Sequence, residues 1–246
     1  MAIKYYPNRV FRALLPPVDA ISKKNTVLKL SGVSDISSTA IAETLTPNRD
    51  WKVVGIKFTF SNATARNYSA SIIGGRSVLE NLNDFLFFKI PGTGSQKITL
   101  TPGFYTGTEL ATELQTQLDA NSKFADLGVT FTVAYDATTG LYTITPSSGD
   151  IQYLEHNVSG TLPNQYSVAG HLFGFNEDTA FASPIISDTV VAGLDSETAI
   201  ILEAGGTDLS HYNSDPHILS LDEAIKIETN TAGVVVTYSV DYQLIG

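Results

Sequence analysis

A helix-start signal followed by a leucine repeat is the local feature that most restricts how this chain folds. Thr106 and Glu109 fit a capping box. In this motif the threonine hydroxyl accepts a hydrogen bond from the Glu109 N–H, and the glutamate carboxylate accepts one from the Thr106 N–H. Leu110, Leu114 and Leu118 follow at four-residue spacing, which places them on one face of a helix. The pattern predicts an amphipathic helix of about three turns that packs on an apolar surface.

Strand signals on both sides of the helix indicate what that surface is. Residues 98–101 before it and 130–135 after it alternate apolar and polar side chains, the period of two that is typical of a strand. A turn over residues 136–140 ends in glycine and leads into a return strand that continues to Ile144. We therefore expect the helix to pack on a β-hairpin.

Less regular signals continue the same module. Residues 151–154 suggest a further strand, and residues 166–173 suggest a short helix that Ser167 caps and Gly174 ends. Closing strands are expected at residues 189–191 and 198–202. Together these elements predict an α+β module over residues 97–203.

The order of these elements resembles a module of virion structural proteins from bacteriophages and large DNA viruses. In that family a strand ending in Pro-Gly precedes a tyrosine and a leucine-spaced helix, and an F-T-V-x-Y hairpin and an L-x-G-F segment follow. The matching residues here are Thr101-Pro102-Gly103, Tyr105, the three leucines, residues 131–144 and Leu172-Phe173-Gly174-Phe175. The resemblance covers about two-fifths of the chain. It implies a role in a capsid, vertex, spike or tail, and it implies no catalytic residues.

The rest of the chain predicts a mainly β domain. Strand patterns occur at residues 51–60, at 68–73 as their return strand, at 85–90 as a strand buried on both faces, and at 224–228 and 234–242. Only 16% of the residues are charged, and Thr, Ser, Val and Tyr are abundant, which favours strands. We expect residues 26–92 and 210–246 to form one antiparallel β-sandwich, with jelly-roll topology as one option and the 97–203 module inserted between two strands.

Residues 1–25 are expected to form an N-terminal arm. The pair Pro16-Pro17 favours an extended course, and basic and apolar side chains surround it. Because such an arm is poorly suited to remain in water, we expect it to pack on its own domain or, as we prefer, on a neighbouring copy. The candidate residues for an oligomer interface are Lys4, Arg9, Phe11, Arg12, Leu14 and Leu15.

The net charge of −10 is distributed unevenly along the chain. Residues 1–90 carry 12 Lys/Arg and 6 Asp/Glu, whereas residues 91–246 carry 3 Lys/Arg and 19 Asp/Glu. This difference indicates either two solvated domains of different composition or a polarity that orients neighbouring copies in an assembly. Direct binding to nucleic acid is not expected, because phosphates repel the acidic part.

No pattern in the sequence indicates a catalytic site or a cofactor. Cysteine is absent, and neither H-E-x-x-H, a Walker sequence nor G-x-S-x-G occurs. The cluster Asp208, His211, Asp215 and His217 could bind a divalent metal, although a polar loop explains it better. The oxygen-rich residues 176–179 could likewise bind Ca²⁺, although they lack the spacing of an EF-hand loop.

Targeting signals are equally absent from the sequence. No apolar stretch follows the first charged residue, so a signal peptide is not expected. No apolar run approaches the roughly 20 residues of a membrane helix. We expect synthesis in a host cytoplasm, a final location in the virion and no membrane partner.

These observations favour a non-enzymatic virion structural protein that self-assembles and builds or decorates a capsid vertex, spike or tail. Its expected partners are copies of itself and other virion proteins. One alternative is a carbohydrate-binding module for host attachment. Exposed aromatic side chains such as Tyr5, Tyr6, Tyr105 and Tyr153 could stack on a host glycan, although a tyrosine on a strand more often serves packing. A second alternative is a hydrolase on a β scaffold, since a catalytic pair of carboxylates need not be adjacent in sequence.

Overall fold

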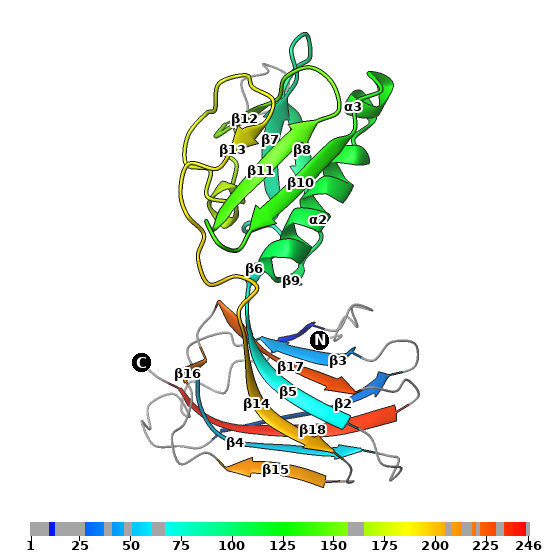
Figure 1. Cartoon of the computed structure of the whole chain (residues 1–246), viewed down its shortest axis with the longest axis vertical. Coiled ribbons are helices and arrows are strands. Elements are labelled where there is room, and N and C mark those ends of the chain that lie inside the picture. Colours follow the sequence, from blue (N-terminus) through cyan, green and yellow to red (C-terminus); the bar gives the residue numbers. More distant parts are fainter. Residues whose placement is uncertain are drawn as a thin grey trace. The chain divides into compact units, whose positions relative to one another are not determined.

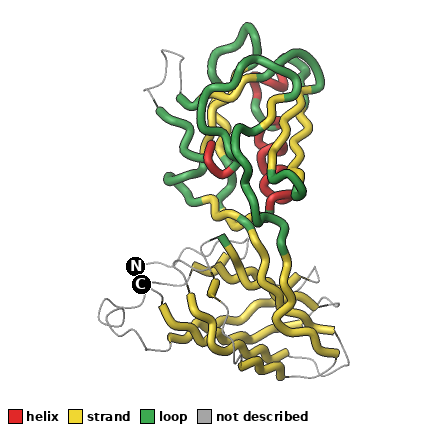
Figure 2. Tube along the Cα trace, turned by 60° about the vertical axis from the view of Figure 1, so that its left-hand side comes forward, coloured by secondary structure: helices red, strands yellow, loops and turns green. Residues whose placement is uncertain are grey.

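The chain divides into two compact units. Unit 1 comprises Met1–Gly74 and Ser196–Gly246, and unit 2 comprises Gly75–Asp195. The structure is a computed structural model that describes residues 10–12, 28–36, 41–46, 51–60, 67–156, 165–204, 208–212, 218–219, 222–229 and 234–244. Its sheets are mainly antiparallel, and the described part of unit 1 contains strands but no helix (Figures 1 and 2).

The described residues of unit 1 form two five-stranded sheets. The first has the order β1 (Val10–Arg12), β3 (Ile41–Thr46), β17 (Glu223–Thr229), β5 (Asn67–Gly74), β14 (Glu197–Ala204). The second has the order β15 (Asp208–Tyr212), β4 (Trp51–Phe60), β18 (Val234–Leu244), β2 (Leu28–Ile36), and β16 (Ile218–Leu219) also pairs with β4. All neighbours are antiparallel except β1 and β3.

The four strands β2, β3, β4 and β5 alternate between the two sheets of unit 1. β4 pairs with β15, β16 and β18, whereas β5 pairs with β14 and β17. The expectation that residues 68–73 return beside residues 51–60 is therefore wrong. Alternation along a strand predicts which side chains are buried, but it does not identify the partner strand, which here comes from the other end of the chain.

The described residues of unit 2 form two α-helices, one short 3₁₀ helix and three small antiparallel sheets. One sheet has the order β10 (Phe131–Asp136), β11 (Leu141–Pro146), β13 (Ile185–Ile186), and a second has the order β12 (Gln152–Leu154), β7 (Phe85–Lys89), β8 (Gln96–Thr99). The third pairs β6 (Arg76–Val78) with β9 (Gly103–Tyr105). The helices are α2 (Gly107–Asp119), α3 (Ser122–Asp126) and the short 3₁₀ helix η1 (Gly170–Leu172).

Helix α2 forms as the sequence predicts. The Thr106 N–H donates to Glu109 Oε2 over 2.9 Å, and the Glu109 N–H donates to Thr106 Oγ1 over 3.4 Å, which completes the capping box. Leu110, Leu114 and Leu118 are fully buried. The helix packs on β10, so the expected packing of the helix on a hairpin is confirmed.

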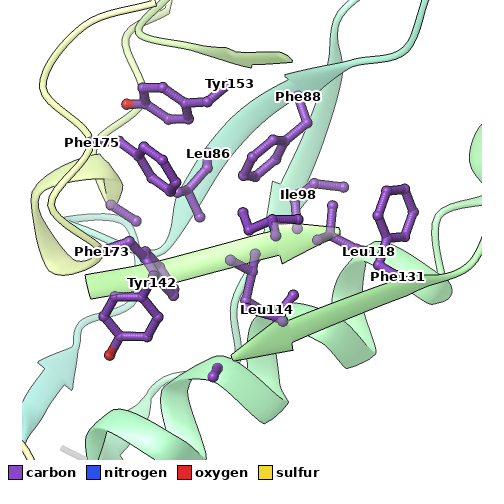
Figure 3. Packing of buried hydrophobic residues seen from close by; sticks show 14 of the residues in the cluster. Leu86, Phe88, Ile98, Leu114, Leu118, Phe131, Tyr142, Tyr153, Phe173 and Phe175 are labelled. Atoms are coloured by element: carbon purple, nitrogen blue, oxygen red, sulfur yellow. The ribbon is translucent and has the colours of Figure 1, made fainter. Parts of the chain in front are cut away.

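One hydrophobic core holds unit 2 together. Leu114 and Leu118 of α2 lie against the inner face of the β10–β11 hairpin (Figure 3). The ring of Tyr142 contacts Phe173 edge-on at a centroid distance of 5.0 Å, and Tyr153 stacks on Phe175 at 4.8 Å. Every residue of this cluster lies between Val78 and Leu194, so unit 2 supplies its own core.

The unit boundaries differ from the expected 97–203 module at both ends. β7 was expected in the sandwich, but it pairs with β12 and β8 of unit 2, and its central residues Leu86, Phe87 and Phe88 are fully buried there. At the other end, β14 pairs with β5 of unit 1. The apolar content of both strands was predicted correctly, and their partners were not.

The segment after β12 is less regular than expected. Only Gly170–Leu172 is helical, as a 3₁₀ turn. Ser167 does not cap it, because its hydroxyl donates to the Leu154 carbonyl and accepts from the Phe87 N–H. Gly174 has φ +77°, the left-handed conformation that the sequence predicts. Residues 189–191 form no strand, and β13 lies at Ile185–Ile186 instead.

Candidate functional site

The sheet β10-β11-β13 presents one face to the core and the other to solvent. Along all three strands, buried residues alternate with more exposed ones. We call the solvent side the outer face and define it as Thr132, Ala134, Asp136, Leu141, Thr143, Thr145 and Ile186. Ile186 is 52% exposed and Val190, beside the β10–β11 turn, is 62% exposed. Most of this surface is therefore uncharged and consists of small or β-branched side chains.

The backbone edges of this sheet are used within unit 2. On the β10 side, the Phe131 N–H donates to Asp119 Oδ1 over 2.8 Å, and the Val133 N–H donates to Gln115 Oε1 over 3.0 Å. Side chains of α2 thus occupy donors that an added strand would need. Beyond β13, the N–H groups of Asp188 and Thr189 both donate to the Gly174 carbonyl over 3.0 Å. The outer face is consequently more accessible than the edges.

The seven residues of the outer face include one ionisable side chain. This side chain is Asp136, and hydrogen bonds from the Thr138 N–H and the Thr139 hydroxyl lower the pKa of that carboxyl. A carboxylate held ionised in this way accepts hydrogen bonds but does not donate a proton near neutral pH. The alternation in residues 130–135 indicated Thr132 and Ala134, but no sequence signal indicated Ile186.

Asp195 anchors the end of unit 2 to the beginning of α2. Its carboxylate accepts from the Thr108 N–H over 3.1 Å and from the Thr108 hydroxyl over 2.6 Å. Asp195 adopts φ +61°, a left-handed conformation that costs energy for most residues but is tolerated by Asp and Asn. The negative charge of this carboxylate is also stabilised by the partial positive charge at the N-terminus of the helix.

Replacing Asp195 with alanine is expected to lower the stability of the first turn of α2 by about 1–2 kcal/mol, because a capping acceptor and a residue suited to left-handed φ are lost together. Asparagine also tolerates left-handed φ and keeps one acceptor oxygen, so Asp195→Asn should lower the stability of the first turn of α2 by less than Asp195→Ala does. Hydrogen exchange of the amides at the start of α2 would measure both. Equal exchange in the wild type and in Asp195→Ala would show that this contact does not hold the helix.

Two tyrosines beside this anchor act as neutral donors. The Tyr135 hydroxyl donates to the Val191 carbonyl over 2.8 Å, and the Tyr142 hydroxyl donates to the Gly107 carbonyl over 3.3 Å. Burial raises the pKa of both phenols, with a further contribution from the Asp195 carboxylate. Both groups therefore remain protonated at neutral pH and serve the packing of unit 2 rather than acid–base chemistry.

A polar cluster in unit 1 has a buried serine and a half-exposed glutamate. The Ser71 hydroxyl donates to Glu197 Oε1 over 2.6 Å, and Lys226 Nζ lies 3.8 Å from Glu197 Oε2. Ser71 is only 3% exposed, so a substrate cannot reach its hydroxyl. The three residues belong to β5, β14 and β17, and the cluster links these neighbouring strands.

The predicted metal sites gain no support from the described residues. Among these, no group of three His, Cys, Asp or Glu side chains could hold an ion. Asp208 and His211 lie on β15, while Asp215 and His217 lie outside the described residues. In the 176–179 loop, Asp178 Oδ1 accepts from the Glu155 N–H over 2.6 Å, which gives this carboxylate a structural role.

The arm contributes a short strand to the chain's own sheet. Phe11 and Arg12 belong to β1, which runs parallel to β3 and pairs Phe11 with Leu45. For these two residues the structure shows the first of the two expected courses, pairing within the chain's own domain, and packing on a neighbouring copy stays a prediction. The remaining arm candidates lie outside the described residues and are Lys4, Arg9, Leu14 and Leu15.

The two tyrosines proposed for glycan stacking in unit 2 are not free for it. Tyr153 is 1% exposed because its ring is part of the core. The Tyr105 hydroxyl donates a hydrogen bond to the Thr101 carbonyl over 2.8 Å. Burial, and in second place the charge of Glu113, raise the pKa of Tyr105 to about 12. The interpretation of these two side chains as an exposed sugar platform is therefore wrong for Tyr153 and weakened for Tyr105.

Comparison with protein-family models, with curated proteins and with solved structures finds no match. Within the described part of the chain, no helix has the length and apolar character needed to cross a membrane.

Proposed function

We propose that this chain is a non-enzymatic structural protein of a virus particle, built on a jelly-roll β-sandwich that carries unit 2 as an insertion. The proposal places it in a capsid vertex, spike or tail, where copies of the chain contact one another and other virion proteins. Its mechanism is the burial of complementary surface, without turnover of a substrate.

The observation that carries the proposal is the nested strand pairing of unit 1. β2 pairs with β18, β3 with β17, β4 with β15 and β5 with β14, so that early strands pair with late ones in reverse order. In addition, β18 pairs with β4 and β17 with β5. A long hairpin that rolls up into two sheets produces this pairing, and such double Greek keys occur in viral capsid and lectin domains.

The insertion of unit 2 fits the same topology. Unit 2 leaves the chain after β5 and rejoins it before β14, and these two strands form the innermost pair of the nest (Figure 1). An insertion at the tip of the hairpin leaves every other pairing intact. The resemblance of the α2 and hairpin segments to a virion module then favours a particle component over other jelly-roll proteins, since a fold alone does not define function.

A carbohydrate-binding protein is the second candidate, because lectin domains share the jelly-roll topology. A glycan array on the purified chain separates the two. Binding of a defined glycan by a stable monomer would favour attachment over assembly, and it would contradict the proposal.

The charges of the chain predict a salt-dependent assembly. Residues 1–74 carry ten Lys/Arg and four Asp/Glu, whereas unit 2 carries four Lys/Arg and thirteen Asp/Glu. If the basic part of one copy contacts the acidic unit of the next, raising the salt concentration should lower the average mass, because the Debye length shortens from ~10 Å at 0.1 M to ~3 Å at 1 M. Light scattering at both salt concentrations measures this. An oligomer of unchanged mass would show that the interface is apolar.

A further inference from the structure

We infer that the solvent side of the sheet β12-β7-β8 binds a sugar that carries a carboxylate. The inference goes beyond the proposed function, because it concerns a ligand and does not require copies of the chain to associate. It assigns to unit 2 a binding surface for an acidic glycan.

Strand β7 divides its side chains between two surfaces. Leu86 and Phe88 belong to the core of unit 2, so Phe85, Phe87 and Lys89 lie on the opposite side of the sheet. The rings of Phe85 and Phe87 contact each other there at a centroid distance of 5.7 Å. This side of the sheet therefore has an aromatic pair of its own, separate from the core.

Two lysines lie over aromatic rings on this side of the sheet. Lys97 Nζ on β8 lies 3.9 Å from the centroid of the Phe85 ring, and Lys89 Nζ on β7 lies 5.8 Å from the centroid of the Phe181 ring. We call this surface the lysine face and define it as Phe85, Lys89, Lys97, Thr99, Gln152 and Phe181. It combines two cations, two aromatic rings and two neutral polar side chains.

The register of the strands brings the two lysines within the span of one ligand. Lys97 pairs with Phe87, and Lys89 follows Phe87 by two residues on the same side of β7. Diagonal neighbours of this kind lie about 7–8 Å apart on a sheet. A ligand of one or two sugar rings can therefore contact both lysines.

Neither ammonium group has an oxygen partner in the part of the chain that the structure describes. Unit 2 nevertheless carries thirteen Asp/Glu against four Lys/Arg, and none of the six residues of the lysine face is acidic. An aromatic ring attracts an ammonium group but supplies no charged acceptor, so the N–H donors of both lysines remain available to an anion. Complementary charge thus favours an anionic ligand on this face.

The charge of unit 2 as a whole limits the size of that anion. Its acidic side chains outnumber its basic ones by nine, and this excess repels a nucleic acid or another polyanion. A ligand with a single carboxylate is repelled much less and still pairs with an ammonium group. The lysine face therefore fits a small acidic ligand better than a charged polymer.

The uncharged side chains of the face favour a sugar over an acidic peptide. The Phe181 ring is 39% exposed, which lets it stack on the apolar side of a sugar ring. The Gln152 amide donates to the Thr179 carbonyl over 2.7 Å, which fixes this side chain and leaves its oxygen as an acceptor for a hydroxyl. Addition of a peptide strand is disfavoured at the β12 edge, where Ile151 already bridges Ala182.

A glycan array that carries neutral, uronic-acid and sialic-acid sugars tests the inference on the full chain. We expect binding to at least one carboxylated sugar. Calorimetric titration with that sugar and with its carboxyl-reduced derivative should show an affinity at least tenfold lower for the reduced form, because the charged partner of the lysines is lost. Equal affinity for both forms would overturn the inference, as would binding of a polyglutamate peptide in place of any sugar.

Lysine variants test whether the binding occurs at this face. Lys89→Gln removes one ammonium group of the lysine face, and Lys123→Gln on α3 makes the same change of charge in unit 2 outside that face. Lys89→Gln should weaken binding of the carboxylated sugar about tenfold or more, whereas Lys123→Gln should leave it unchanged. Equal affinities of the two variants would place the site elsewhere and overturn the inference.

Light scattering of the wild type keeps this inference apart from the proposed function. An array without a bound carboxylated sugar overturns the inference and leaves the proposed function standing, because assembly does not need this ligand. A protein that stays monomeric and binds the sugar through Lys89 supports the inference and contradicts the proposed function.

Discussion

Replacing Leu114 with alanine is expected to lower the free energy of unfolding of unit 2 by about 2–5 kcal/mol. Leu114 is fully buried at the centre of the α2 leucine repeat and faces the inner side of the hairpin (Figure 3). The substitution removes apolar contacts and leaves a cavity that the surrounding side chains fill only in part. This loss is a large share of the total stability of an ordinary domain, about 5–15 kcal/mol.

Thr116→Ala is the matched control for this experiment. Thr116 lies on the exposed side of the same helix, and alanine is the better helix former, so its effect should be close to zero or slightly stabilising. Denaturant unfolding followed by circular dichroism would compare the two variants. A Leu114→Ala protein as stable as Thr116→Ala would mean that α2 does not anchor the core of unit 2.

Local signals predicted most of the elements of unit 2. The capping box at Thr106 and Glu109 begins the helix where expected, because both partners lie within one turn of each other. The hairpin of β10 and β11 forms for the same reason, since its turn of residues 136–140 fixes the register of the two strands. Signals of this kind depend on residues close in sequence, and they do not depend on the rest of the fold.

Long-range pairing limited the prediction of unit 1. The strand pattern of β4 was clear, but β4 pairs with β15 and β18, which follow it by well over 100 positions in the sequence. Alternation gives each strand an inner and an outer side and leaves its partner undetermined. For the same reason the sequence predicts β7 as part of a β-sandwich with other strands of the chain, although its apolar run is buried in unit 2.

The outer face was predictable only in part. The hairpin pattern identifies Ala134 and Thr143 as positions that face away from the helix. Ile186 completes the row only because residues 185–191 run beside β11, where the Ser187 N–H donates to the Tyr142 carbonyl over 2.9 Å. Two residues of strand are too short for a sequence signal, so the third strand and its exposed isoleucine required the structure.

Replacing Gly174 with alanine is expected to lower the free energy of unfolding of unit 2 by about 3 kcal/mol or more, through two separate effects. Gly174 has φ +77°, where a Cβ is strained, and an added Cβ would collide with the Thr189 carbonyl oxygen. Moving the backbone to relieve the collision would break the bonds from the Asp188 and Thr189 N–H groups to the Gly174 carbonyl. The segment that positions β13 would then lose its support.

Gly149→Ala separates the two effects. Gly149 has φ +70°, nearly the same conformation, but among the described residues nothing lies within 4 Å of an added Cβ. The free energy of unfolding that Gly149→Ala loses should therefore reflect backbone strain alone, about 1–2 kcal/mol. If thermal unfolding gives the same loss for both variants, the Thr189 carbonyl moves aside at little cost. If Gly174→Ala loses more stability than Gly149→Ala, close packing at Gly174 holds the segment that leads from β13 in place.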